Sequence, residues 1–127
     1  MRKLLEAKYN KHTQTNEYIE KYCSLTDLKQ ELSDGKEYFI DYTTKGKEID
    51  YRTIIHFWRL DIIDKETNKK YKKETYVLLI ERGDARYYIE EGNLVIDIRL
   101  EFHKLEELID YLVKNKYVKK SEIIKKG

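Results

Sequence analysis

Apolar and polar side chains alternate with a period of two through the middle of the chain. Between residues 51 and 63, His56 and Trp58 fall on one side of an extended backbone, and Ile55 and Phe57 fall on the other. This is the period of a β-strand, in which successive side chains point to opposite faces. A strand of this length needs partners for its backbone, so the chain must build a sheet.

Further segments show the same period, and turn residues separate them. Glycine-containing or polar turns stand between neighbouring segments, and consecutive strands joined by short turns pair in antiparallel fashion. We therefore expect an antiparallel meander sheet of about five strands. Its strands are expected at residues 37–43, 51–63, about 71–82, 86–90 and 94–100.

Two segments instead show apolar residues at helical spacing. One helix is expected at about residues 24–33, where Ser24 can cap the first turn and Asp34-Gly35 can end the last one. The second is expected at about residues 101–115, where apolar positions follow an i, i+3, i+7 pattern. A sheet flanked by these two helices predicts the α+β fold class.

The chain of 127 residues has the size of one domain, so we expect a single α+β domain over residues 1–127. Residues 1–23 carry only weak patterns, in which Leu4 with Tyr9 and Tyr18 with Tyr22 suggest two short helices. Residues 116–127 form a basic tail that lacks a clear pattern.

Charge and cysteine usage exclude several classes. The 26 Lys and Arg residues nearly balance 24 Asp and Glu residues, so bulk charge does not favour nucleic acid or membrane. Cys23 is the only cysteine, which excludes an internal disulfide and every multi-cysteine zinc site. The first dozen residues lack the apolar run of a secretory signal, so we expect a cytoplasmic protein.

Motifs of the common enzyme classes are missing. The sequence contains neither the glycine-rich phosphate-binding patterns nor G-x-S-x-G, and its three histidines are far apart. We expect no catalytic residues, no metal ligands and no cofactor. A metal-dependent nuclease is a weaker alternative, in which Asp61 and Asp97 would meet across the sheet, while Asp27 with Lys29 is assigned to the first helix.

Two clusters of lysines support nucleic-acid binding as an alternative function. The hairpin from Lys65 to Lys73 and the basic C-terminal tail could together contact a phosphate backbone. The same lysines could instead keep a hairpin tip and a terminus soluble, and the lack of interleaved arginine favours that interpretation. The candidate residues are Lys65, Lys69, Lys70, Lys72, Lys73, Lys116, Lys119 and Lys120.

Aromatic residues on the expected strands support protein binding. The chain has 12 tyrosines, and alternation along strands turns some of them away from the core. Exposed Tyr and Trp side chains dominate the energetics of protein interfaces. The candidate partner-binding residues are Trp58, Tyr76, Tyr87 and Tyr88.

From Ser24 onward the order of elements resembles an SH2 domain. The helix at 24–33, the strand KEYFIDY, the hairpins and the segment FHKLEELIDYL follow one another as in that family. In SH2 domains the first strand carries an arginine that binds phosphotyrosine. Here the corresponding positions hold Asp41 and Tyr42, so the resemblance implies a fold and not that activity.

In size and in its Lys- and Tyr-rich composition, the chain is also similar to small phage-encoded proteins, anti-CRISPR proteins among them. These proteins bind and block a host enzyme. Our leading hypothesis is therefore a non-catalytic protein-binding module, encoded by a phage or other mobile element, that inhibits a host protein in the cytoplasm. The identity of the partner and the oligomeric state stay open.

Overall fold

The computed structural model describes residues 4–10, 15–21, 25–63, 70–87 and 94–119. These ranges contain two helices and six strands. The helices are α1 (Leu25–Ser33) and α2 (Leu105–Lys114). The strands are β1 (Leu4–Asn10), β2 (Thr15–Lys21), β3 (Tyr38–Thr44), β4 (Tyr51–Ile63), β5 (Lys70–Asp84) and β6 (Leu94–Phe102).

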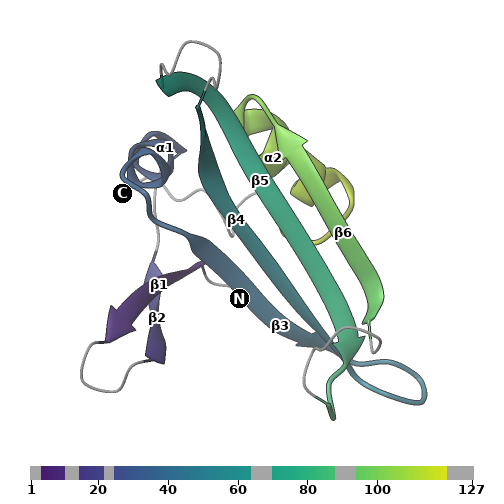
Figure 1. The fold of residues 1–127 in the computed structure, drawn as a ribbon. Coiled ribbons are helices and arrows are strands. Elements are labelled where there is room, and N and C mark those ends of the chain that lie inside the picture. The colour runs from purple at the N-terminus through teal and green to yellow at the C-terminus, as the bar shows by residue number, and fades with distance from the viewer. Residues whose placement is uncertain (1–3, 11–14, 22–24, 64–69, 88–93, 120–127) are drawn as a thin grey trace.

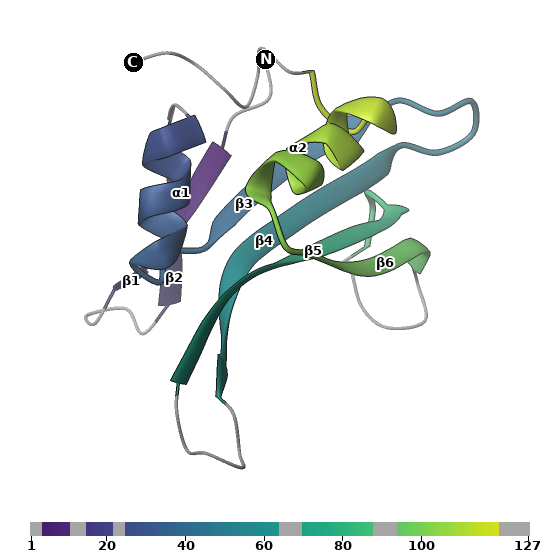
Figure 2. The same cartoon turned by 90° about the horizontal axis from the view of Figure 1, so that it is seen from above.

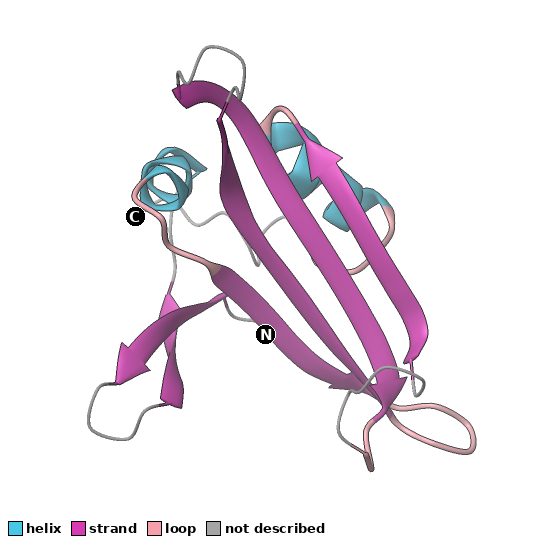
Figure 3. Cartoon of the chain, in the orientation of Figure 1, coloured by secondary structure: helices cyan, strands magenta, loops and turns pink. Residues whose placement is uncertain are grey.

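The strands form one antiparallel sheet in the order β2-β1-β3-β4-β5-β6 (Figure 1). Strands β3 to β6 are a four-stranded meander in which each strand pairs with the next one along the chain. The β1–β2 hairpin joins this meander through only two residue pairs, Leu5 with Phe39 and Glu6 with Tyr38. Figure 3 shows the hairpin diverging from the long strands beside it.

Both described helices lie on the same side of the sheet (Figure 2). Register assigns the residues of each strand to a face, because directly paired residues of neighbouring strands point to the same side. Ile40, Ile55, Ile80 and Ile98 are consecutive partners across β3 to β6. Their row lies under the helices, and we call this side the covered face.

The hydrophobic core lies between the covered face and the helices. Its fully buried members include Leu28 and Leu32 of α1 and Leu105, Leu108 and Leu112 of α2. On the sheet the core includes Tyr38 and Phe57, whose rings stack with centroids 5.9 Å apart, together with Ile40, Ile55, Tyr76, Leu78 and Ile80.

The two helices end in the same way. After α1, Gly35 has φ of +87° and its N–H donates to Leu32 O, while the next N–H donates to Glu31 O. After α2, Lys116 has φ of +60° and the Tyr117 N–H donates to Leu112 O at 2.9 Å. Both are Schellman motifs, and the one after α2 places a lysine where glycine is preferred.

The structure confirms the predicted α+β class. It also confirms an antiparallel meander that one helix precedes and another follows in the sequence. The meander has four strands instead of about five. Of the expected strand at 86–90, Arg86 and Tyr87 belong to a turn after β5, and the rest lies outside the described residues. The C-terminal helix begins at Leu105, because Glu101 and Phe102 complete β6. Ser24, the expected cap of α1, lies outside the described residues.

The weak helices expected before residue 24 were wrong, since residues 4–10 and 15–21 form the β1–β2 hairpin. The polar loop expected between them, at residues 12–16, was wrong where the structure describes it. Thr15 and Asn16 belong to β2, and residues 11–14 lie outside the described ranges. Neither described helix combines the length and the apolar character that crossing a bilayer requires.

Candidate functional site

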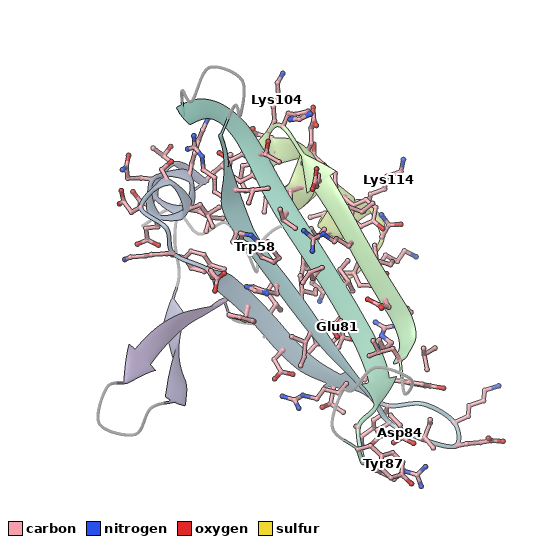
Figure 4. The ribbon with its side chains drawn as sticks, in the orientation of Figure 1. Trp58, Glu81, Asp84, Tyr87, Lys104 and Lys114 are labelled. Carbon is pink, nitrogen blue, oxygen red and sulfur yellow. The ribbon has the colours of Figure 1, made fainter. Side chains whose placement is uncertain are left out.

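The face of the sheet opposite the helices carries its own apolar band, which we call the open face. Phe39, His56 and Leu79 are consecutive register partners on it, and Trp58 pairs with Val77 in the next row. No described helix covers these rows, and Figure 4 shows Trp58 and Glu81 along this side of the sheet. Apolar residues at these positions do not contribute to the core under the helices.

Three rings form a continuous ladder on the open face. The Phe39 and His56 rings are nearly parallel, with centroids 4.0 Å apart and an interplanar angle of 11°. The Trp58 ring is tilted by 37° to His56 at a centroid distance of 4.5 Å. All three side chains are half-buried, whereas Val77 beside them is fully buried. The ladder is therefore a preformed, stacked surface whose rings are partly exposed.

The packing of the His56 ring favours its neutral form. Burial between the rings lowers the pKa of His56, and the nearby Glu37 carboxylate opposes that shift without overcoming it. The Nε2 atom lies 3.7 Å from Glu37 Oε2, too far for a direct hydrogen bond, and has no hydrogen-bond partner among the described residues. The ladder is thus uncharged at neutral pH, with a carboxylate at its border.

Among the side chains that the structure describes, acidic ones outnumber basic ones around the ladder. Glu81 and Asp97 are direct register partners on β5 and β6, and like charges in that arrangement repel each other. Asp41 is already neutralised, since Arg52 donates two hydrogen bonds to it at 3.0 and 2.6 Å. The charged residues at this border are Glu37, Asp41, Glu81, Asp97 and Glu101 against Arg52 and Arg99.

Of the predicted partner-binding residues, Trp58 lies on the open face and Tyr76 does not. Tyr76 pairs with Arg59 and Phe102 on the covered face and is fully buried, which corrects its assignment to an exposed surface. Burial also raises the pKa of its phenol, and the hydroxyl has no hydrogen-bond partner among the described residues. Alternation along β5 places Tyr76 and Val77 on opposite faces of the sheet. It does not indicate which of these faces α1 and α2 cover.

The other two predicted tyrosines belong to the segment after β5. Tyr87 is 59% exposed and its ring lies 5.5 Å from the Arg86 guanidinium carbon. Arg86 in turn donates to Asp84 at 2.7 Å, and this pair lowers the pKa of the Asp84 carboxyl. Figure 4 places Tyr87 at the end of the sheet, away from Trp58. Tyr88 lies outside the described residues, and a role for either tyrosine stays a prediction.

The lysines proposed for nucleic-acid binding fall in separate regions. Lys70, Lys72 and Lys73 begin β5, whereas Lys116 and Lys119 are exposed beyond the end of α2. Lys65, Lys69 and Lys120 lie outside the described residues. The structure therefore leaves this alternative as a prediction.

The carboxylates proposed for a metal site do not meet. Asp97 is opposite Glu81 and in line with Ile54, whereas Asp61 lies near the other end of β4, beyond a register shift. This corrects the expected pairing of Asp61 with Asp97. Within the described ranges, no three His, Cys, Asp or Glu side chains gather closely enough to hold a metal ion.

A polar cluster lies on the covered face beyond α2. Arg82 donates from Nε to Thr53 Oγ1 at 2.7 Å, and its guanidinium lies 5.9 Å from the centre of the Tyr117 ring. Tyr117 also stacks on Tyr111, and burial raises its pKa. These contacts pack the segment after α2 against the sheet, so we assign the cluster a structural role.

Sequence reasoning did not name Phe39 or His56 as candidate binding residues. Trp58 and His56 were assigned to one face of their strand, but the partner strand and its register were needed to add Phe39. Comparison with protein families, with curated proteins and with solved structures gave no match. The resemblance to SH2 domains gains no support there, and the open face is interpreted from its own geometry.

Proposed function

We propose that the protein is a non-catalytic binding module that docks a protein partner on the open face of its sheet. The observation that carries the proposal is the preformed ladder of Phe39, His56 and Trp58. Rigid aromatic rings bury large areas on binding and lose little conformational entropy, which is why they act as interface anchors.

The border of the ladder favours a partner with basic residues around an apolar centre. Asp41 is satisfied by Arg52, but Glu81 and Asp97 face each other, so a lysine or arginine from the partner would relieve their repulsion. The same carboxylates would repel a phosphate backbone. Nucleic acid is therefore not the ligand that this face favours, whatever the lysines elsewhere bind.

Occupying a partner's surface in this way suits an inhibitor. The composition favours a phage or mobile-element protein that acts on a host protein in the cytoplasm, as anti-CRISPR proteins do. Such a role requires no reactive group on the open face, because the protein acts by covering the partner's own site.

Trp58 is the only tryptophan, so its fluorescence reports directly on the open face. The first step is to capture partners from the source cell on the immobilised chain and to identify those retained. Titrating a purified partner should then shift the Trp58 emission to the blue as the ring is buried. The affinity should fall as salt rises, because the border charges are screened.

Variants separate docking on this face from other binding. Trp58→Ala should weaken the affinity by on the order of tenfold to a hundredfold, as expected for an anchor residue. Glu81→Lys should weaken it without touching the core. Lys114→Ala, on α2 across the sheet from the open face, is the matched control and should bind as the native chain does. Equal affinity of the native, Trp58→Ala and Glu81→Lys chains, all folded by circular dichroism, would contradict the proposal.

A further inference from the structure

Strand β6 forms one edge of the sheet. It runs regularly from Leu94 to Phe102, and β5 is its only strand neighbour among the described residues. Backbone N–H and C=O groups along a strand point alternately to the two sides, so half of them are directed away from β5. A long edge strand of this kind is a template for another strand.

The residues of β6 on the covered face are only half-buried. Ile98 is the partner of Ile80, and Leu100 is the partner of Leu78, yet the β5 residues are fully buried and the β6 residues are not. The helix α2 packs on this face, so we attribute the difference to the lack of a described neighbour beyond β6. Adding a strand there would complete the burial of a row of apolar side chains.

The outward residues of β6 are charged in a self-complementary order. Asp97 and Arg99 stand on either side of Ile98 on the open face, and both are exposed. If two copies of β6 pair antiparallel about Ile98, Asp97 of each copy lies directly opposite Arg99 of the other. That register also pairs all nine residues of β6, with apolar residues opposite apolar ones on the covered face. A register shifted by one pair in either direction would oppose like charges and pair fewer residues.

We propose that β6 pairs with β6 of a second copy, on a two-fold axis at Ile98, to form a symmetric dimer with one continuous sheet. Two Asp97–Arg99 pairs fix the register, and each Arg99 also reduces the repulsion between Asp97 and Glu81. The two open faces then adjoin on one side of the joined sheet. This inference stands independently of the proposed function, since it requires no other partner.

A charge-swap experiment tests the dimer on the full chain. Sedimentation of the native protein over a dilution series should show a monomer–dimer equilibrium. Asp97→Arg and Arg99→Asp each place like charges opposite each other twice, so each should raise the dimer dissociation constant by on the order of tenfold or more. Both positions are exposed, and unchanged circular dichroism should confirm that the variants fold.

Mixing the two single variants provides the decisive measurement. The Asp97→Arg chain carries arginine at both positions and the Arg99→Asp chain carries aspartate at both, so each contact between the two chains joins opposite charges. A heterodimer should therefore form, and the double variant Asp97→Arg/Arg99→Asp should dimerise as the native chain does. A native chain that stays monomeric at every concentration would overturn the proposal. So would single variants that dimerise like the native chain, or a mixture that fails to pair.

A cross-link tests the register itself. In a Cys23→Ser background, Ile98→Cys places two thiols at the axis, where oxidation should link the copies covalently. Val95→Cys is the matched control, because in this register residue 95 lies opposite residue 101 and far from its own copy. Efficient linkage through position 95, or none through position 98, would contradict a two-fold axis at Ile98.

Discussion

The two faces of the sheet carry similar apolar side chains that are buried to different extents. On the covered face, Ile55, Phe57 and Leu78 are fully buried under the helices. On the open face, His56, Trp58 and Leu79, their neighbours along the same strands, are half-buried with no described helix above them. Only one face is needed to close the core. The difference teaches that the apolar band of the open face is not required to close the core, which is why we propose it as the docking surface.

The open face is organised beyond what scattered surface residues require. Single exposed apolar residues are common and need no explanation. Here three rings from β3 and β4 stack in sequence, and carboxylates on β5 and β6 lie at their border. A contiguous apolar surface bordered by charge is typical of an interaction site.

The largest effect on stability is expected when a leucine of the covered face is truncated, in comparison with its neighbour on the open face. Leu78→Ala removes a fully buried side chain from the core and should lower the free energy of unfolding by about 2 to 5 kcal/mol. Leu79→Ala, one residue along β5, should cost less than about 1.5 kcal/mol, because the half-buried side chain leaves no enclosed cavity. Urea denaturation of both variants measures the difference. Equal losses would show that the open face is as important to the fold as the covered one.

A smaller effect is expected at the ends of the two helices that cover the sheet. Lys116→Gly should raise the free energy of unfolding by about 1 kcal/mol, because glycine adopts a positive φ without strain. Gly35→Ala should lower it by a similar amount, for the same reason and not by a clash, since a Cβ there would have no neighbour within 4 Å. Thermal unfolding of the two variants provides the comparison. A stability loss in Lys116→Gly would show that the lysine side chain makes a compensating contact.

The smallest effect on stability is expected from protonation of His56 on the open face. Burial lowers its folded-state pKa below 6.5, so between that folded value and 6.5 the unfolded chain binds more protons. The stabilising contribution of neutral His56 is therefore present above pH 6.5 and is lost as the pH falls below it. Glu37 is the carboxylate that faces the ring and limits the loss.

The substitution His56→Phe keeps a ring between Phe39 and Trp58 and removes the titration. The stability of the native chain relative to this variant should be constant above pH 6.5 and should decrease below it, as measured by urea denaturation at several pH values. A difference that does not change with pH would show that the packed ring titrates as it does in the unfolded chain.

Much of the fold could be predicted because alternation over long strands is unambiguous. The segment at 51–63 matches β4, and the helix at 24–33 matches α1 apart from its cap. The short strands β1 and β2 were missed because seven residues with few apolar side chains fit either period. Their pairing with each other, which the local pattern does not encode, makes them strands.

The candidate site could be predicted only in part. Alternation separates Tyr76 from Val77 but does not say which of them the helices cover, so Tyr76 was assigned to the wrong face. Phe39 joins His56 only through the register between β3 and β4, which depends on the length of the intervening loop. The pairing of Glu81 with Asp97 likewise depends on the register between β5 and β6.

The junction between the β1–β2 hairpin and β3 has a consequence for assembly size. Only Tyr38 and Phe39 of β3 pair with β1, so the sheet has a step there and its two margins differ in shape. A two-fold contact through β6 buries the same edge of the sheet in both copies. If β6 pairs with β6 as we propose, the remaining margin of each copy differs in shape from β6, so the assembly would close at two copies and would not extend into filaments.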